Sequence, residues 1–197
     1  TVTFGPVSVT WAGFRVDYRN PIGFNTTGTN NFAFNADRAT SMGLDAAARL
    51  FVKPVQLWLY YSHYFQNEVS VKAEDDARNI GDLAKDKVWA GITYDQSRFS
   101  ATLLGRFVGN RQTVPTNPLG KVSGYLSLDA NLVLKDLLFE GASLALRCTN
   151  LLDSKYSHPG IGAADTGNDA SMPSQGELNS ALPQPRRSFY LSLMLDL

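Results

Sequence analysis

The sequence predicts an all-β protein, namely a transmembrane antiparallel β-barrel of about eight strands. Three observations lead to this fold class. In eight segments every second residue is apolar, and alternate residues of a strand share one face. The connections between these segments alternate between tight turns and long stretches rich in Gly, Asn, Asp, Pro and Ser. Aromatic residues gather near the ends of the apolar faces, as in barrels that cross a lipid membrane.

The first predicted strand, residues 7–19, alternates less cleanly than the others. Its apolar residues change face midway, with Val7, Val9 and Trp11 on one face and Phe14, Val16 and Tyr18 on the other. One extra residue in a strand reverses the direction of every side chain that follows it. We therefore expect a β-bulge near Ala12-Gly13, where a small residue and a glycine tolerate the irregular backbone.

The remaining strands follow in chain order. We expect them at residues 38–52, 55–66, 86–95, 98–109, 121–135, 139–150 and 187–197. Residues 55–66 carry bulky side chains on both faces, whereas the last segment has one continuous apolar face from Phe189 onward. The side chains predicted to face lipid include Leu126, Leu128, Leu132, Leu191 and Leu193. Each segment is long enough for a tilted strand to cross a bilayer.

The connections predict the orientation of the barrel. Tight turns are expected near 53–54, 95–98 and 136–138, and long links near 20–38, 67–84, 110–120 and 157–187. Short turns on the periplasmic side and long loops outside the cell are typical of bacterial outer-membrane barrels.

The strands of a soluble β-sandwich or a lipocalin-like barrel would also alternate between apolar and polar residues. The placement of particular residues therefore has to distinguish these folds from a membrane barrel. Aromatic residues at the ends of the apolar faces, typical of interfacial girdles, are Phe65, Tyr94, Phe99, Phe107 and Phe189. Charged residues on the opposite, lumen-facing side are Asp45, Arg49, Arg106, Asp129, Lys135, Arg147 and Asp196. The girdles favour the membrane barrel.

Composition excludes several other classes of protein. The formal net charge is zero, which argues against binding to nucleic acid through its phosphates. No run of 18 apolar residues is present, so a membrane-spanning helix is excluded. Cys148 is the only cysteine, which rules out an internal disulfide and a cysteine-based metal site. We expect no cofactor.

The sequence offers little support for catalysis, and we expect no enzymatic activity. His63 and His158 are the only histidines, and Ser62 must point away from His63 because neighbours in a strand lie on opposite faces. We expect His63 to be an interfacial side chain. His158 begins the longest loop and is our one candidate contact for a ligand.

Two loop motifs have simple explanations. The glycine-rich residues 160–167 suggest a phosphate-binding loop, but they lack the required strand-to-helix context, so we interpret them as an external loop. The acidic run Glu74-Asp-Asp76 could hold a cation, although such runs are usually only solvated. We therefore expect no metal site.

Several motifs make the interpretation more specific. Asn150-Leu-Leu-Asp-Ser-Lys-Tyr156 resembles the N-L-x-D-x-x-Y segment of TonB-dependent outer-membrane receptors. Leu182-Pro-Gln-Pro-Arg-Arg-Ser-Phe189 resembles the P-x-P-G-R-x-F motif before that family's final strand. Residues 35–45 and 98–110 are similar to the family's N-A-G-x-A-x-x-x-G-x-E and R-Y-V-G-x stretches. The resemblance extends from about residue 9 to the end of the chain.

The resemblance implies a function and partners. Members of the family take up a scarce nutrient, such as an iron-siderophore, cobalamin, haem or a glycan, across the outer membrane of Gram-negative bacteria. Their barrel of about 22 strands encloses a plug domain, on which the TonB complex pulls. Residues 1–197 would then form the C-terminal barrel segment without a plug domain. Lipid, the plug, the remaining strands and, indirectly, TonB are the expected partners, and no nucleic acid is expected.

The chain also departs from the family pattern. Arg186 occupies the position of a glycine, which suggests a less sharply turned start of the final strand, and Leu197 occupies the position of a terminal Phe. Three interpretations remain open: a fragment of a longer receptor, one half of a split receptor, or a self-standing eight-stranded barrel with a structural or scaffold role. An eight-stranded bore would have to bury many bulky and charged side chains. We therefore expect an open, curved sheet whose edges do not pair with each other.

Overall fold

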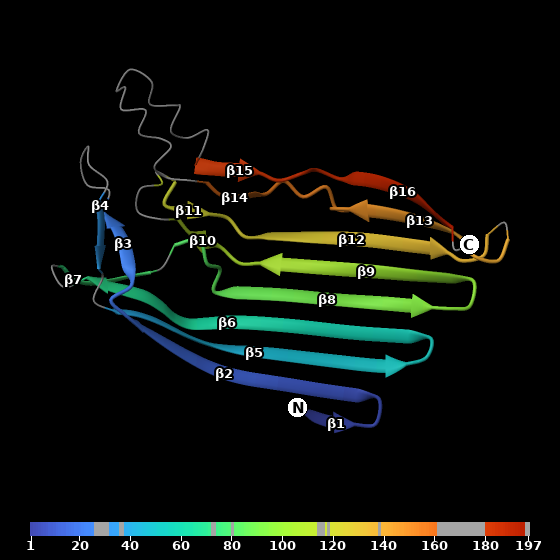
Figure 1. Cartoon of the computed structure of the whole chain (residues 1–197), viewed down its shortest axis with the longest axis horizontal. Helices are drawn as coiled ribbons and strands as arrows, with labels where there is room; N and C mark the ends of the chain where they lie inside the picture. Colours follow the sequence, from blue (N-terminus) through green and yellow to red (C-terminus); the bar gives the residue numbers. More distant parts are fainter. Residues whose placement is uncertain are drawn as a thin grey trace, which may run out of the picture.

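The structure is a computed structural model that describes residues 1–25, 32–35, 38–71, 74–79, 81–113, 117, 119–137, 139–160 and 180–195. Its main feature is one antiparallel sheet whose strands lie in chain order (Figure 1). The strands of this row are β1 (Val2–Phe4), β2 (Val7–Arg19), β5 (Arg38–Val52), β6 (Val55–Val71), β8 (Asp86–Asp95), β9 (Phe99–Val108), β12 (Tyr125–Leu134), β13 (Ala142–Thr149) and β16 (Ser188–Leu195). The described residues contain no helix with the length and apolarity needed to span a membrane.

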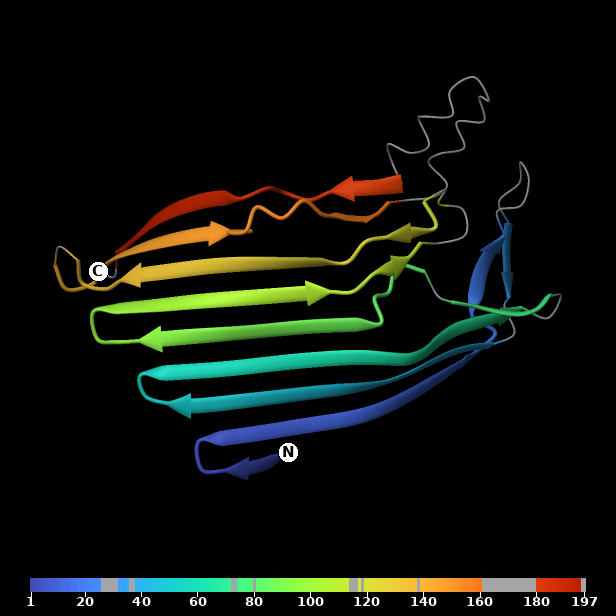
Figure 2. The same cartoon turned by 180° about the vertical axis from the view of Figure 1, so that it is seen from behind.

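Shorter strands extend the sheet at one end. They are β3 (Ile22–Asn25) with β4 (Phe32–Asn35), β7 (Glu74–Asn79) beside β6, β10 (Arg111–Gln112) with β11 (Lys121–Val122), and β14 (Ser157–Pro159) with β15 (Ala181–Pro183). All of them lie at the same end of the long strands, and the tight turns lie at the opposite end (Figures 1 and 2). We call these the loop end and the turn end. This arrangement agrees with the predicted alternation of long loops and tight turns.

Each face of the sheet is continuous from strand to strand, because the register keeps like residues opposite one another. Leu103 pairs with Ile92 on one side and with Ala130 on the other, and Leu146 pairs with Leu132 and Leu191. Among the described residues no other element covers the resulting apolar face: Leu191 is 67% exposed and Phe189 is 72% exposed. An apolar surface of this extent marks contact with lipid or another partner.

The five predicted girdle residues all lie on this exposed apolar face. Phe65, Phe107 and Phe189 lie toward the loop end, whereas Tyr94 and Phe99 stack on each other near the turn end with ring centroids 5.6 Å apart. The five lipid-facing leucines predicted from the sequence share the same face. Leu126 pairs with Phe107, and Leu193 pairs with Leu144.

The bulge predicted near Ala12-Gly13 is wrong. The pairing of β2 with β5 runs without a break from Val7 opposite Leu50 to Arg19 opposite Arg38. The apolar residues change face for a different reason, because beyond Gly13 the outer side of the strand becomes charged and the strand leaves the apolar band. The bulge lies instead in β6, where Phe65 is the extra residue between two paired positions.

Other boundaries differ from the prediction for local reasons. Strand β6 extends to Val71, and the predicted strand 121–135 divides into β11 and β12. β13 begins only at Ala142, because Asp136 and Gly141 in the connection after β12 have positive φ angles of 50° and 89°, which interrupt the extended backbone. The Asp136 carboxylate accepts a hydrogen bond from the Gly141 N–H at 2.9 Å, which stabilises this turn.

The sheet is open. β1 is an additional strand that was not predicted, and it forms one edge, whereas β16 forms the other. Within the described residues the backbone pairs of β16 are with β13 and those of β2 are with β1 and β5. The predicted absence of direct pairing between the first and last strands is therefore confirmed.

Candidate ligand-binding site at the loop end

His158, the one ligand contact proposed from the sequence, lies in β14 at the loop end. Its partner is Arg111 of β10, which is only 5% exposed. The Arg111 guanidinium donates one hydrogen bond to His158 Nδ1 at 2.7 Å and another to the Ser157 carbonyl oxygen at 2.7 Å. Arg111 thus joins two loops whose residues lie 47 positions apart in the chain.

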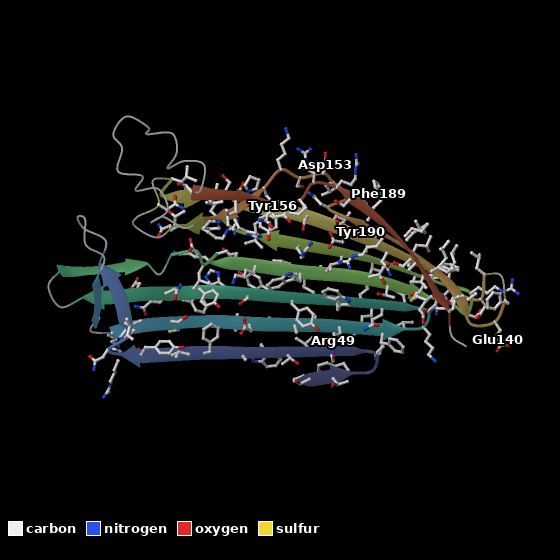
Figure 3. The ribbon with its side chains drawn as sticks, turned by 45° about the horizontal axis from the view of Figure 1, so that its top comes forward. Arg49, Glu140, Asp153, Tyr156, Phe189 and Tyr190 are labelled. Carbon is white, nitrogen blue, oxygen red and sulfur yellow. The ribbon has the colours of Figure 1, made fainter. Side chains whose placement is uncertain are left out.

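Two tyrosines complete the cluster. Tyr125, at the start of β12, and Tyr156 stack with ring centroids 3.9 Å apart and an interplanar angle of 14°. The His158 ring stands edge-on to both at 5.9 Å, and the Arg111 guanidinium lies 5.6 Å from the centroid of Tyr125. Tyr156 lies near the loop end in Figure 3. We call Arg111, Tyr125, Tyr156 and His158 the mouth cluster.

Electrostatics fix the protonation state of the histidine. Burial, and in addition the positive charge of Arg111, lower the pKa of His158. Because a guanidinium can only donate, Nδ1 must be the unprotonated acceptor, and the ring hydrogen resides on Nε2. The cluster can therefore offer a ligand N–H and O–H donors and aromatic faces.

Neighbouring contacts hold the loops around the mouth cluster in place. The side chain of Asn117 is almost fully buried, and its amide donates hydrogen bonds to the carbonyl oxygens of Ser180 at 2.8 Å and Gly160 at 3.4 Å. The backbone N–H of Asp82 donates to the Gln112 carbonyl oxygen at 2.6 Å. Burial raises the pKa of the Asp82 carboxyl group, although Arg111 opposes this effect. Three loops thus meet in one hydrogen-bonded structure.

A cavity of about 520 Å³ adjoins the mouth cluster. Its polar lining includes Lys121, Lys155, Ser157, Gln184 and Arg186. The two lysines are exposed, so cationic groups are available to a negatively charged ligand. The cavity and the mouth cluster share Tyr156, and Ser157, whose carbonyl oxygen accepts a hydrogen bond from Arg111, also lines the cavity.

The two sequence motifs on either side of the long loop bind each other. The carboxylate of Asp153 accepts hydrogen bonds from the Arg186 side chain, with Nε at 2.8 Å from Oδ1, and from the Arg187 N–H at 3.1 Å. These contacts hold the pKa of Asp153 well below its usual range. Arg186 occupies the position of a glycine in the family pattern, and its side chain is bound by Asp153. The backbone before β16 accommodates the arginine at this position.

Asn150 is the centre of this contact and is almost fully buried. Its amide nitrogen donates to the carbonyl oxygens of Ser154 at 2.9 Å and Pro185 at 3.3 Å, and its amide oxygen accepts from the Ser154 N–H at 2.9 Å. Its own N–H donates to the Asp129 carboxylate at 2.9 Å. These bonds fasten the end of β13 to the start of β16, close to Tyr156.

Among the described residues, the polar face carries the charged residues expected there. Arg106 donates to Asp129 at 2.9 Å, Ser62 donates to Asp45 at 2.6 Å, and Arg49 binds the Tyr60 hydroxyl group. Arg147 is exposed and lies opposite Tyr190. Arg49 and Tyr190 are marked in Figure 3. Lys135, just beyond β12 at the turn end, pairs with Asp95 at 2.7 Å, and Asp196 lies outside the described residues.

Other sequence expectations can now be compared with the structure. Ser62 and His63 lie on opposite faces, as predicted, and the His63 Nδ1–H donates to the Asp86 carboxylate at 2.7 Å on the apolar-face side. In the described part of the chain no three His, Cys, Asp or Glu side chains come together as metal ligands. The side chains of Glu74 to Asp76 and residues 161–167 lie outside what the structure describes.

Sequence reasoning missed Arg111, Tyr125 and Tyr156. Tyr156 could have been found, because it ends the Asn150–Tyr156 motif. Arg111 carried no signal, since its role depends on a contact with a distant loop.

Comparison with known proteins agrees with the fold. A sequence profile of the family described as "TonB dependent receptor-like, beta-barrel" matches residues 2–151. No match is found among curated proteins. The chain is similar in structure to the copper transporter OprC, with a TM-score of 0.71 and 17% identity over 96% of this chain and 28% of that protein.

Two receptors are also similar in structure. The ferric-catecholate import receptor Fiu of E. coli K12 has a TM-score of 0.69 at 17% identity, over 96% of this chain and 25% of its own. The siderophore receptor PirA of Acinetobacter baumannii has a TM-score of 0.68 at 16% identity, over 98% of this chain and 30% of its own. The chain thus spans less than a third of these proteins, and identities this low establish the fold alone. With the profile covering most of the sequence, the chain belongs to the family of TonB-dependent receptor β-barrels.

Proposed function

We propose that this chain is the C-terminal barrel segment of an outer-membrane receptor for TonB-dependent uptake of a scarce nutrient. Candidate nutrients are an iron-siderophore, cobalamin, haem or a glycan, and the similarity to the copper transporter OprC adds copper. The observation that carries the proposal is the mouth cluster, which three cross-tied loops hold at the loop end. Side chains that such hydrogen bonds hold in place lower the entropy that a ligand would otherwise have to offset on binding.

The chemistry of the site narrows the kind of contact. Stacked tyrosines offer aromatic faces, and the neutral His158 offers an N–H donor. Lys121 and Lys155 in the adjoining cavity add positive charge. This combination suits a ligand with aromatic and anionic groups better than a neutral one.

The polar face supports a plug domain as the partner inside the barrel. Arg147 and Arg49 make no ion pair within the described residues, and both side chains are accessible on this face. Carboxylates of a plug would complete such pairs. A polar and hydrated contact of this kind separates more readily than an apolar one, which suits a plug on which TonB pulls.

The alternative of a self-standing eight-stranded barrel has less support. Within the part of the chain that the structure describes, the two edge strands leave their outer backbone groups without partners in the sheet, and in hydrocarbon each unpaired group costs several kcal/mol. Additional strands from the same or another chain would remove this cost. A split receptor remains the second candidate, because it too supplies a plug and further strands.

Uptake measurements test the proposal. The full-length protein would be produced in a Gram-negative host that lacks its own receptors, and accumulation of radiolabelled iron-siderophores, copper, cobalamin, haem and oligosaccharides would be measured with and without TonB. We expect TonB-dependent uptake of at least one of these. Arg111→Gln should lower the affinity for that ligand. Glu140→Gln, in the turn between β12 and β13, is the control and should leave the affinity unchanged. TonB-independent accumulation, or none with any probe, would contradict the proposal.

A further inference from the structure

A hollow lies in the polar face between β2, β5, β6 and β8, toward the loop end. Its volume is about 480 Å³, within the roughly 300–1,000 Å³ of small-molecule sites. Its lining combines small side chains from β2 and β5 with aromatic ones from β6 and β8, namely Thr10, Ala12, Ala47, Tyr60, Tyr64 and Trp89. We call this cavity the lumen hollow.

Neighbouring residues hold the two tyrosines of the lumen hollow in place. Phe14 meets Tyr64 edge-on, with ring centroids 5.6 Å apart. Gly43 leaves room for this contact, because a Cβ atom there would come within 2.6 Å of the Phe14 ring. On the other side, Arg49, which Figure 3 labels on β5, donates a hydrogen bond to the Tyr60 hydroxyl group, and its guanidinium lies 5.6 Å from the centroid of that ring. The aromatic side of the hollow is therefore organised before any ligand binds.

Lys87 gives the lumen hollow a positive charge. It is half-buried, and its ammonium group lies 5.5 Å from the centroid of the Tyr64 ring. Within the described part of the chain it makes no ion pair. Asp45, the acid of the hollow, instead accepts a hydrogen bond from Ser62 at 2.6 Å, and the register places it and Lys87 on opposite sides of Ser62. A half-buried cation without an anionic partner favours the binding of an anion.

The register connects the lumen hollow with the mouth cluster. Lys87 is opposite Val108, and Val108 is opposite Tyr125 of the mouth cluster. Neighbouring strands are about 4.8 Å apart, so the backbones of Lys87 and Tyr125 are about 10 Å apart. In the row two residues nearer the turn end, Trp89 is opposite Arg106, and Arg106 is opposite Ser127. The two sites are thus neighbours on one face of the sheet.

Three buried donors near this connection have no partner among the described residues. They are Nε of Arg111, Nε of Arg106 and Oγ of Ser127. Arg106 uses its Nη2 on Asp129 at 2.9 Å, which leaves its Nε without an acceptor. Buried donors in proteins are nearly always paired. Their position between the mouth cluster and the lumen hollow favours a ligand with acceptor oxygens, such as a carboxylate.

We propose that the lumen hollow is a second binding site for the transported ligand, and that it takes a carboxylate attached to a flat ring. Lys87 pairs with the carboxylate, while Trp89 and Tyr60 contact the ring. A ligand that leaves Arg111 at the mouth then finds its next cation about 10 Å away along the wall. The inference rests on the proposed function, because only a transported ligand passes from the mouth into the lumen. The competing partner of Lys87 is a carboxylate of the plug domain.

Fluorine NMR of the purified full-length protein, labelled with fluorotryptophan, tests this site. The resonance that is lost in Trp89→Phe belongs to Trp89, so its shift reports binding in the lumen hollow and not at the mouth. The probes are benzoate, which joins one carboxylate to one flat ring, and its neutral counterpart benzamide. The test variant is Lys87→Gln, and Lys87→Arg keeps the charge. Lys53→Gln, in the exposed turn between β5 and β6, is the matched control.

We expect benzoate, and not benzamide, to shift the Trp89 resonance in a saturable manner. Lys87→Gln should weaken benzoate binding about 10-fold through loss of a charge-assisted contact, whereas Lys87→Arg and Lys53→Gln should stay within about twofold of the wild type. Three results would overturn the inference: no shift with benzoate, which a plug carboxylate on Lys87 would cause, an equal shift with benzamide, or unchanged affinity in Lys87→Gln. Absence of nutrient uptake would contradict the proposed function but leave this binding measurement unaffected, so the two failures are distinguishable.

Discussion

Asn150 provides a sharp test of how the end of β13 is fastened to the start of β16. Its side chain makes three hydrogen bonds to backbone groups of Ser154 and Pro185 and is almost fully buried. A buried hydrogen bond contributes about 0.5–1.5 kcal/mol, so loss of all three should cost about 2–4 kcal/mol. The backbone of Asn150 has a φ angle of 51°, which Asn and Gly adopt more readily than other residues.

Two substitutions separate the two contributions. Asn150→Gly removes the hydrogen bonds but tolerates the positive φ angle, whereas Asn150→Ala also carries a backbone penalty of about 1–2 kcal/mol. We therefore expect the free energy of unfolding to fall in the order wild type, Gly, Ala. Asn131→Ala, on the polar face of β12, should change it by less than about 0.5 kcal/mol.

The assay is urea unfolding of the full-length protein in phospholipid vesicles, followed by tryptophan fluorescence and by electrophoretic mobility. If Asn150→Ala and Asn150→Gly both stay within about 0.5 kcal/mol of the wild type, the buried hydrogen bonds do not stabilise this junction. If Asn150→Gly is as destabilising as Asn150→Ala, the positive φ angle adds no penalty and the lost hydrogen bonds alone account for the decrease in stability.

Three further predictions use the same protein. Leu191→Arg should lower the free energy of unfolding in vesicles by about 2–4 kcal/mol if that side chain lies near the bilayer midplane; an unchanged value would refute its contact with lipid. After Cys148→Ala, an impermeant thiol reagent on intact cells should modify Lys155→Cys and spare Asp136→Cys; the reverse labelling would invert the proposed orientation. Burial lowers the pKa of His158, so its contribution to stability should be fully present above about pH 6.5, the pKa of a free imidazole, and should be lost as the pH falls through the lower folded value. His158→Gln stays neutral and should abolish this pH dependence; an identical pH profile in that variant would exclude the histidine as its source.

The sequence by itself determined the strands and the direction of their side chains. Alternation with a period of two is a local property, and it predicted the limits of β2, β5 and β8 and the apolar face that contains Leu126 and Leu191. The sequence also predicted that the two edges of the sheet would not pair with each other. Eight strands are too few to enclose so many bulky and charged side chains.

Only the tertiary structure decided which distant residues meet. Arg111 and His158 are 47 positions apart, and Asp153 and Arg186 are 33 apart, so their contacts depend on register and loop path and not on any local pattern. The wrongly predicted bulge in β2 has a similar cause, because a local pattern cannot distinguish two explanations. A change of apolar face can come from an extra residue in the strand or from a strand that leaves the apolar band, and the sequence looks the same in both cases. The pairing of each residue of β2 with β5 distinguishes them, because a bulge would interrupt that register and the observed register is continuous.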